Sequence, residues 1–327
     1  MEHFISYEIN TVETCPYRNL FNELFIENLK EKETFQDSNI YFITKTKKVR
    51  FNLQKTSFVN KTDFNTEIIL GDNEKSVNCT ASLYDLVNVF SHFHETKEDF
   101  EELLRCQNPL ITVDYRSEDS KSDILSLYLL IDGQDEYPIK LLPENFEVVC
   151  KIDFKNEPEI LYIGQSFNML DRIQSHKALH KSVSQIEDNE EVKVCFINFK
   201  YGYGGNKAQA TINGKMWDYW LNQDRTSADY RTKIDLVERF LIHFFKPIYN
   251  NQHVNSNMME DKRVKEILLT ESISSMSVGL SVWGFGYEYW TEKQPLKAEL
   301  FSFDFNNPER GYQEGMVWSM PDKKSSN

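Results

Sequence analysis

The chain is poor in the residues that mark several structural classes. Its five cysteines are scattered over 327 residues and never form a Cys-x-x-Cys pair, so neither a disulfide framework nor a zinc knuckle is indicated. Glycine (12) and proline (9) are also scarce, which argues against a fibrous architecture. We therefore expect a folded protein whose cysteines are mostly buried thiols.

Membrane and export signals are also missing. The N-terminal residues contain no basic segment followed by an apolar core, so they do not resemble a secretory signal. No stretch approaches the roughly 18 uninterrupted apolar residues that are needed to cross a bilayer. The sequence predicts a cytoplasmic protein with no membrane contact.

Positive charge is in deficit, but unevenly along the chain. The 37 Lys and Arg against 51 Asp and Glu leave a net charge of -14, which argues against general binding of polyanions. Residues 1–150 carry 15 basic and 27 acidic side chains, whereas residues 151–260 carry 14 of each. The acidity therefore does not argue against polyanion binding by the second segment. The acidic first segment is expected to bind a protein partner or to restrain activity.

What the chain does contain is apolar and aromatic residues, at 40% and 13%, enough to bury a sizeable core. The first 145 residues alternate helical patterns, over 17–33 and 82–105, with short runs rich in Ile, Val, Phe and Tyr, such as 39–44, 49–53 and 66–70. These runs predict strands. We expect a separate α+β domain over residues 1–145, without recognisable chemistry.

The pattern changes at residue 147. Two short strands, the second ending in Tyr162-Ile163-Gly164-Gln165-Ser166, are predicted before a helix. Arg172 and His176 fall on the apolar side of that helix, where a cation and an imidazole are costly without a partner. An anionic group is expected beside them.

A second polar residue interrupts a later apolar helix that Pro247 ends. Glu238 lies on the inner side of this helix, among Ile234, Val237 and Leu241. A buried carboxylate needs a cation or a metal, and a single carboxylate suits a hard divalent ion that keeps most of its waters. The chain thus places Arg, His and Glu where packing alone would use Leu.

These residues carry a resemblance to the GIY-YIG nuclease family, over about residues 147–251. The segment is similar to that family in Tyr162-Ile163-Gly164, in Arg172 and His176 on the next helix, in Glu238, and in the closing Lys246-Pro247-x-Tyr249-Asn250. The resemblance implies an α+β fold, a small antiparallel three-stranded sheet flanked by helices. It would be preceded by the separate α+β domain and followed by a β-rich C-terminal extension.

The resemblance also implies an activity, the hydrolysis of phosphodiester bonds by an endonuclease. Glu238 would hold one Mg²⁺ or Mn²⁺, Arg172 would stabilise charge on the phosphate, and Tyr162 and His176 would orient or activate water. Asn250 would fix the end of the module. The implied partner is nucleic acid, DNA rather than RNA, in restriction or antiphage defence.

The sequence departs from the family at the first strand, whose tyrosine is missing from the aligned stretch. Cys150 would stand in the place of that tyrosine, or Lys151 after a shift of one residue, and either could act as a base only with a depressed pKa. An alternative is therefore a catalytically impaired module, derived from a nuclease, that binds nucleic acid or assembles with a protein.

The expected boundaries follow from these segments. The nuclease-like domain would span residues 146–260 and carry a hairpin insertion near 200–225. Residues 261–327 would form the β-rich extension, with a disordered tail after Pro321.

Overall fold

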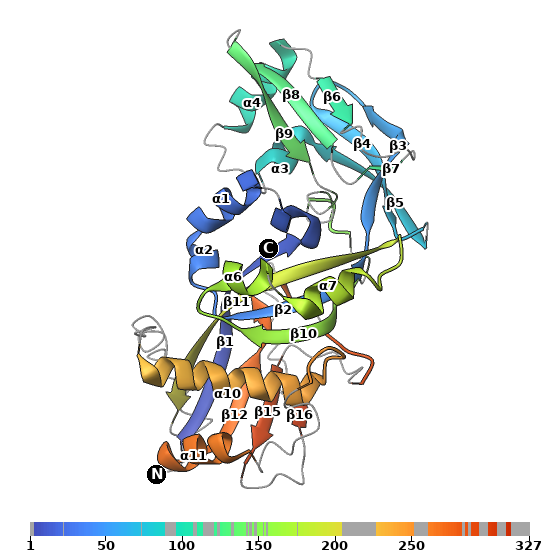
Figure 1. Ribbon diagram of the computed structural model, residues 1–327. Coiled ribbons are helices and arrows are strands. Elements are labelled where there is room, and N and C mark those ends of the chain that lie inside the picture. The colour runs from blue at the N-terminus through green and yellow to red at the C-terminus, as the bar shows by residue number, and fades with distance from the viewer. Residues whose placement is uncertain are drawn as a thin grey trace, which may run out of the picture. The chain divides into compact units, whose positions relative to one another are not determined.

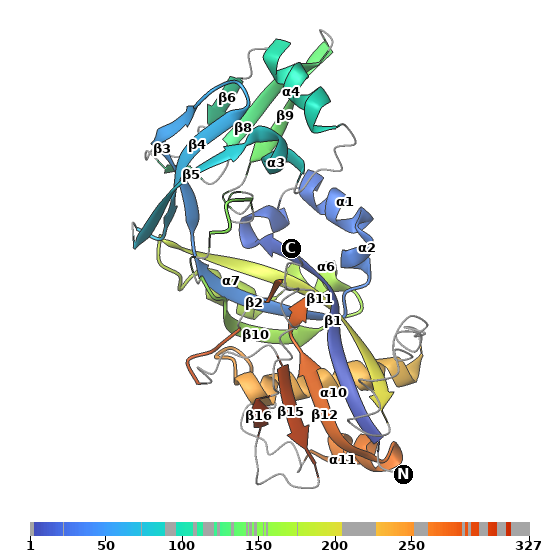
Figure 2. The same cartoon turned by 180° about the vertical axis from the view of Figure 1, so that it is seen from behind.

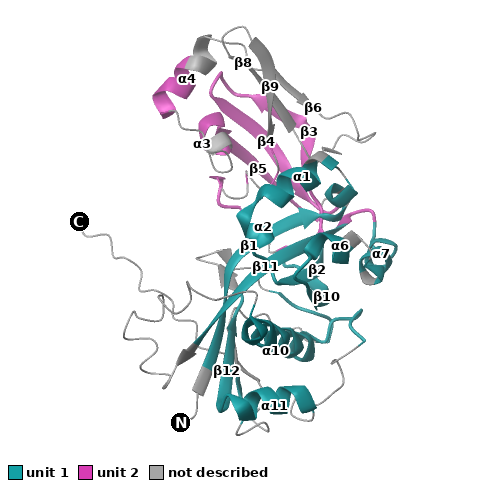
Figure 3. Ribbon diagram, turned by 60° about the vertical axis from the view of Figure 1, so that its left-hand side comes forward, with its two compact units in different colours: residues 1–46, 157–187, 191–327 teal, residues 47–156, 188–190 magenta. Residues whose placement is uncertain are grey.

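The computed structural model is a mixed α+β protein that divides into two compact units (Figure 1; Figure 2 gives the reverse view). Unit 1 comprises residues 1–46, 157–187 and 191–327, and unit 2 comprises residues 47–156 and 188–190 (Figure 3). This division differs from the expected boundary at residue 145, because residues 1–46 belong with unit 1. Unit 2 is inserted into the sequence of unit 1.

The structure describes residues 3–314 with several gaps. The longer gaps are 89–95, 107–109, 114–120, 205–226, 252–260, 294–299 and 306–311, and shorter gaps of one or two residues lie at 22, 73, 123–124, 132–133, 142, 144–145, 147–148, 153, 155, 175, 283–284 and 287–288. Most of the expected hairpin insertion near 200–225 and the expected disordered tail lie outside the described residues.

Unit 1 is built on a seven-stranded sheet with the order β10-β2-β11-β1-β12-β15-β16. The strands are β1 (His3–Pro16), β2 (Ile40–Lys47), β10 (Glu159–Gln165), β11 (Glu190–Gly204), β12 (Ile273–Gly279), β15 (Leu300–Asp304) and β16 (Tyr312–Glu314). β10 pairs antiparallel with β2, and β1 pairs antiparallel with β11 and parallel with β12. The C-terminal strands β12, β15 and β16 extend this one sheet, whereas a separate β-rich extension was expected.

Alternating side chains of β2 supply the two faces of the sheet. Ile40 and Phe42 belong to one buried cluster, whereas Tyr41 and Ile43 belong to another. This is the two-residue period of a strand that is covered on both sides. The cluster around Tyr41 includes residues of the short helices η1 (Tyr17–Phe21), α1 (Glu23–Glu31), α2 (Glu33–Gln36), α6 (Met169–Gln174) and α7 (Lys177–Val183).

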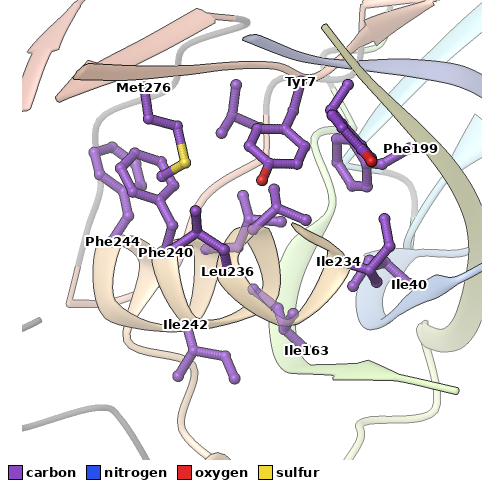
Figure 4. Packing of buried hydrophobic residues seen from close by; sticks show 14 of the residues in the cluster. Tyr7, Ile40, Ile163, Phe199, Ile234, Leu236, Phe240, Ile242, Phe244 and Met276 are labelled. Carbon is purple, nitrogen blue, oxygen red and sulfur yellow. The ribbon is translucent and has the colours of Figure 1, made fainter. Parts of the chain in front are cut away.

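The other face packs against two helices, α10 (Ala228–Phe245) and α11 (Lys262–Thr270). Figure 4 shows Ile234, Leu236 and Phe240 of α10 among side chains of the sheet that include Tyr7 and Ile163. Ser227 caps α10 by accepting a hydrogen bond from the Tyr230 N–H, and Lys246 ends it in the left-handed conformation. The apolar side of α10 therefore packs against β10 and β2. A small hairpin of β13 (Ser281–Val282) and β14 (Phe285–Gly286) completes unit 1.

Unit 2 contains two antiparallel sheets, ordered β5-β4-β3-β7 and β6-β8-β9. Its core gathers Phe51, Phe64, Ile68, Phe100 and Phe146. The elements are β3 (Val49–Phe58), β4 (Asp63–Leu70), β5 (Lys75–Ser82), α3 (Leu83–Asn88), α4 (Lys97–Cys106), β6 (Leu110–Val113), β7 (Lys121–Ser122), β8 (Leu125–Ile131) and β9 (Gln134–Leu141). The strand and helix expectations for the first half of the chain agree with this order.

The chain leaves unit 1 after β2 and re-enters it before β10. The side chain of Asn156 pairs with both backbone groups of Lys47: its Oδ1 accepts from the Lys47 N–H at 3.0 Å and its Nδ2 donates to the Lys47 carbonyl at 2.8 Å. In unit 1, Lys45 lies opposite Glu159 in the strand register, and their side chains form an ion pair at 3.1 Å. Entry and exit of the insertion are therefore on adjacent strands.

The expectation of a strand near residues 148–151 is wrong. Val149 ends a helical segment, and Cys150 and Lys151 lie in a turn of unit 2. Val149 and Cys150 pack against the core of unit 2 instead of pairing with β10. Among the described residues, no helix is long and apolar enough to cross a membrane.

Candidate functional site

The site begins where β2 and β10 pair closely. Gly164 lies opposite Tyr41 in the strand register, and a Cβ atom added to Gly164 would come within 2.6 Å of the Tyr41 ring and 2.7 Å of the Tyr162 ring. Real Cβ atoms essentially never approach other atoms so closely. Glycine is therefore required here, because the two tyrosine rings occupy the space of a side chain.

Three rings meet at this place. Tyr41 and Tyr162 are stacked with ring centroids 5.9 Å apart, and the His176 ring lies 4.4 Å from Tyr162 and 5.7 Å from Tyr41, edge-on to both. Tyr41 is fully buried and Tyr162 partly buried. Two strands and the start of α7 thus place two phenols and an imidazole together.

His176 lies between two helices and not within one, because the expected single helix is broken into α6 and α7. It caps α7: its Nδ1 accepts a hydrogen bond from the Leu179 N–H at 3.4 Å. An accepting Nδ1 assigns the proton of the neutral ring to Nε2. Nε2 is buried and has no hydrogen-bond partner among the described residues. The Nε2–H of the neutral ring is therefore a hydrogen-bond donor without an acceptor among the described residues.

Burial is also what keeps His176 neutral. It lowers the pKa of the imidazole to about 4, with smaller contributions from Arg172 and His180. The side chain is only 6% exposed. At neutral pH His176 is accordingly a neutral hydrogen-bonding group.

Arg172 extends from α6 beside the two tyrosines, on the exposed side of that helix. The negative charge that Tyr41 would carry raises the pKa of Arg172, and Tyr162 adds to this. Burial raises the pKa of Tyr41 far above its ordinary value, and Arg172 opposes the shift without reversing it. The Tyr41 hydroxyl is buried, and side-chain interactions with Arg172 and Tyr162 contribute to the shift of its pKa. A cation and a buried hydroxyl thus lie side by side.

Glu238 approaches from α10 at the end of β10. Its Oε1 accepts a hydrogen bond from the Gln165 N–H at 3.0 Å. Burial raises the pKa of Glu238 to about 7 and Asp235 adds to the shift, whereas the Gln165 N–H, Arg239 and Arg172 lower it. The charge of Arg172 therefore lowers the pKa of Glu238, but burial outweighs this effect and keeps the pKa above its ordinary value.

Asp235, one turn earlier on α10, is occupied by other partners. It accepts hydrogen bonds from Gln165 Nε2 at 3.1 Å and from Arg239 Nε at 3.0 Å, and it forms an ion pair with Arg263 at 3.1 Å. The bond from Gln165 fixes that side chain. The carboxyl with the raised pKa is the neighbouring Glu238.

Asn250 anchors β10 through its backbone. Its Oδ1 accepts from the Ile163 N–H at 2.9 Å and its Nδ2 donates to the Ile163 carbonyl at 2.8 Å. The side chain is 8% exposed. Asn250 therefore holds the backbone between Tyr162 and Gly164 in place.

The site offers a divalent cation one carboxylate, that of Glu238. Among the described residues no group of three or more His, Cys, Asp or Glu side chains could hold a metal. Glu238 alone offers a partly buried carboxylate whose raised pKa shows that a nearby positive charge would stabilise it. A single carboxylate is an ordinary protein contribution to Mg²⁺, which keeps several waters.

Tyr162, Arg172 and His176 lie together beside Tyr41 on the face of the sheet that α6 and α7 cover. Glu238 belongs to α10, which packs on the opposite face, and it reaches the end of β10 at Gln165. Asn250 supports them, whereas Cys150 and Lys151 lie in unit 2 and do not take the place of the first-strand tyrosine. Burial also raises the pKa of Cys150, the opposite of what a base would need.

The residue that the sequence motifs did not reveal is Tyr41. It lies in the strand that pairs with β10, within Asn39-Ile40-Tyr41, far upstream of the aligned segment. The signal that could have found it is this tripeptide at the start of an apolar run. Comparisons of the chain with family models, with curated proteins and with solved structures find no match.

Proposed function

We propose that unit 1 is a metal-dependent endonuclease of the GIY-YIG type, which hydrolyses phosphodiester bonds of nucleic acid, preferably DNA. The observation that carries the proposal is the gathering of Tyr41, Tyr162, His176 and Arg172, together with the Glu238 carboxylate at the end of β10, whose pKa Arg172 lowers. His176 Nε2, which is buried and has no partner among the described residues, supports a ligand that is rich in oxygen.

Tyr41 takes the place of the family's first-strand tyrosine in this proposal. It is supported by the pairing of β2 with β10, which sets Tyr41 opposite Gly164 of the second tripeptide. The strands β10, β2 and β11 then correspond to the small antiparallel sheet of the family, with unit 2 inserted between its first two strands.

The chemistry is attack of water on phosphorus, in line with the leaving oxygen. Arg172 stabilises the charge that develops on the phosphate, and the His176 Nε2–H donates to a phosphate oxygen. The phenols of Tyr41 and Tyr162 hold the water. Burial raises the pKa of Tyr41 far above its ordinary value, so this phenol stays protonated and orients the water, and the proton that the water loses passes to solvent.

Glu238 would hold the cation, Mg²⁺ or Mn²⁺. When bound, the cation supplies positive charge that neutralises the phosphate. The Gln165 N–H fixes one carboxylate oxygen and thereby orients the group.

The test is cleavage of plasmid and of single-stranded DNA by the full chain in Mg²⁺, Mn²⁺ or EDTA. Glu238→Ala should abolish cutting, and Arg172→Ala should slow it on the order of 10²- to 10³-fold. Glu266→Ala and Lys265→Ala, both exposed on α11, are matched controls that should cut normally. Cutting that survives Glu238→Ala and Arg172→Ala contradicts the site, and binding without any cutting favours the impaired module.

Unit 2 is the proposed contact for a protein partner. It carries 13 basic and 22 acidic side chains, so most of the net charge of -14 resides in it. Such a surface suits a basic partner and not a phosphate backbone. The context we propose is restriction or antiphage defence. A pull-down by isolated unit 2 that fails to retain any basic protein contradicts the partner role.

A further inference from the structure

An exposed aromatic residue lies directly beside the candidate site. Phe167 is 47% exposed and follows Gln165 and Ser166, the residues at the end of β10. A large apolar side chain in water is informative when it adjoins a functional site. Gln165 is the residue whose N–H binds Glu238, so Phe167 lies two residues along the chain from a direct neighbour of the proposed metal ligand.

The backbone on both sides of Phe167 is fixed. The Ser166 N–H donates to the Asn39 carbonyl at 3.1 Å, and the Asn168 N–H donates to Ser166 Oγ at 3.0 Å. The Asn168 carbonyl then accepts from the Arg172 N–H as α6 begins. Phe167 is therefore displayed on a rigid turn between a strand and a helix.

A cation stacks on the ring. The guanidinium carbon of Arg231 lies 5.2 Å from the centroid of Phe167, and the Tyr230 ring packs near it at 6.4 Å. Arg231 is exposed, and it begins the stripe of α10 that continues through Asp235 to Glu238. Seven residues of helix separate Arg231 from Glu238, which is about 10 Å along the axis. An aromatic ring and a planar cation thus lie within reach of the nucleotide next to a phosphate at Glu238.

We propose that Phe167 and Arg231 form a subsite for an unpaired nucleobase next to the scissile phosphate. Aromatic rings and guanidinium planes both stack on bases that are splayed out of a duplex, and stacking of this kind is tolerant of sequence. The inference rests on the proposed function of the same unit. It adds a substrate class: strands with an unstacked base at the cleavage position, such as single strands, flaps or distorted duplexes.

The experiment uses the full chain in EDTA, so that nothing is cut, with single-stranded oligonucleotides that carry a fluorescent adenine analogue at successive positions. Stacking quenches the fluorescence of this base. Wild type should quench the fluorescence at one position of the analogue. Phe167→Ala should abolish this quenching and weaken binding of the oligonucleotide roughly 5- to 150-fold. Phe167→Tyr keeps a ring and should retain both. Leu269→Ala, at an 80% exposed position on α11, is the control for loss of an exposed apolar side chain and should behave as wild type.

The outcomes separate the subsite from the nuclease. Equal quenching and affinity in wild type and Phe167→Ala overturn the subsite, even if cutting depends on Glu238. A quench that requires Phe167 in a protein that never cuts keeps the subsite and contradicts the nuclease. Failure of the wild type to bind any of the oligonucleotides overturns the subsite. In cleavage assays Arg231→Ala should raise KM while leaving kcat near wild type, and a change in kcat alone contradicts its role in binding.

Discussion

The ring of Tyr41 occupies the space that a side chain on Gly164 would need, at 2.6 Å from the position of a Cβ atom. Gly164→Ala should therefore force Tyr41 and Tyr162 to move, at a cost of about 1–3 kcal/mol in the free energy of unfolding. Urea denaturation measures this. In a Tyr41→Ala background the same change should cost less, and equal costs in both backgrounds contradict the contact.

Asn250 should be important for stability and not only for activity. Asn250→Ala leaves the buried N–H and carbonyl of Ile163 without their partners, which costs about 1–3 kcal/mol for each group. Asn251→Ala is the matched control, because the neighbouring side chain is exposed. Urea denaturation should show a lower midpoint for Asn250→Ala alone, and similar midpoints for the two variants would refute the role.

Glu238 should make the stability of the free protein depend on pH. Its pKa is about 7 in the folded chain, above the ordinary value of 4.5, so folding favours the protonated carboxyl. This contribution is fully present below about pH 4.5 and is lost as the pH rises through about 7. Glu238→Gln should therefore be more stable than wild type at pH 8 by about 1 kcal/mol or more, and nearly equal to it at pH 4.5.

The measurement for Glu238 is urea denaturation across this pH range without metal. Glu266→Gln, at an exposed position of α11, should follow the wild-type curve. If Glu238→Gln also follows that curve, the carboxyl is not the source of the pH dependence.

Mg²⁺ should stabilise the folded protein through the same carboxylate. A ligand that binds only the folded state at 100 times its Kd adds about 2.7 kcal/mol to the free energy of unfolding. Thermal denaturation at pH 8 with rising Mg²⁺ should raise the Tm of wild type and leave that of Glu238→Gln unchanged. An equal rise in both proteins would show that the cation binds elsewhere.

Unit 2 should be removable from unit 1. Lys45 and Glu159 face each other across adjacent antiparallel strands, so residues 47–156 can be replaced by a short turn that contains Asn-Gly. The shortened chain should unfold cooperatively in circular dichroism. A fragment that starts at residue 146 should not, because it lacks β1 and β2 of the sheet. Folding of this fragment, or collapse of the shortened chain, contradicts the division into units.

Local patterns predicted much of the fold, including the strand over 39–44 and the apolar helix that carries Glu238. They could not predict which strands pair, because pairing is a relation between distant segments. Tyr41 was therefore recognised as part of a strand but not as a neighbour of Gly164. The stretch near Cys150 lies close to β10 in sequence, but it folds with unit 2.

The sequence predicts the chemical groups of the candidate site better than their arrangement in space. The costs of burying His176 and Glu238 are visible in the sequence, since each interrupts an apolar pattern, whereas Arg172, expected on the apolar side of its helix, is exposed. The break between α6 and α7 was not, because a histidine is an unusual residue to cap a helix. Nor do sequence patterns indicate Phe167, since an exposed aromatic residue in a turn has no periodic signal.

The order in which the strands of unit 1 pair bears on how the chain folds during synthesis. His3 of β1 pairs with Ile273 of β12, and β2 must wait for β10, which is made only after unit 2. The contacts of unit 2 are more local, and contacts that are close in sequence form faster. We therefore expect unit 2 to fold before the strands of the candidate site can meet.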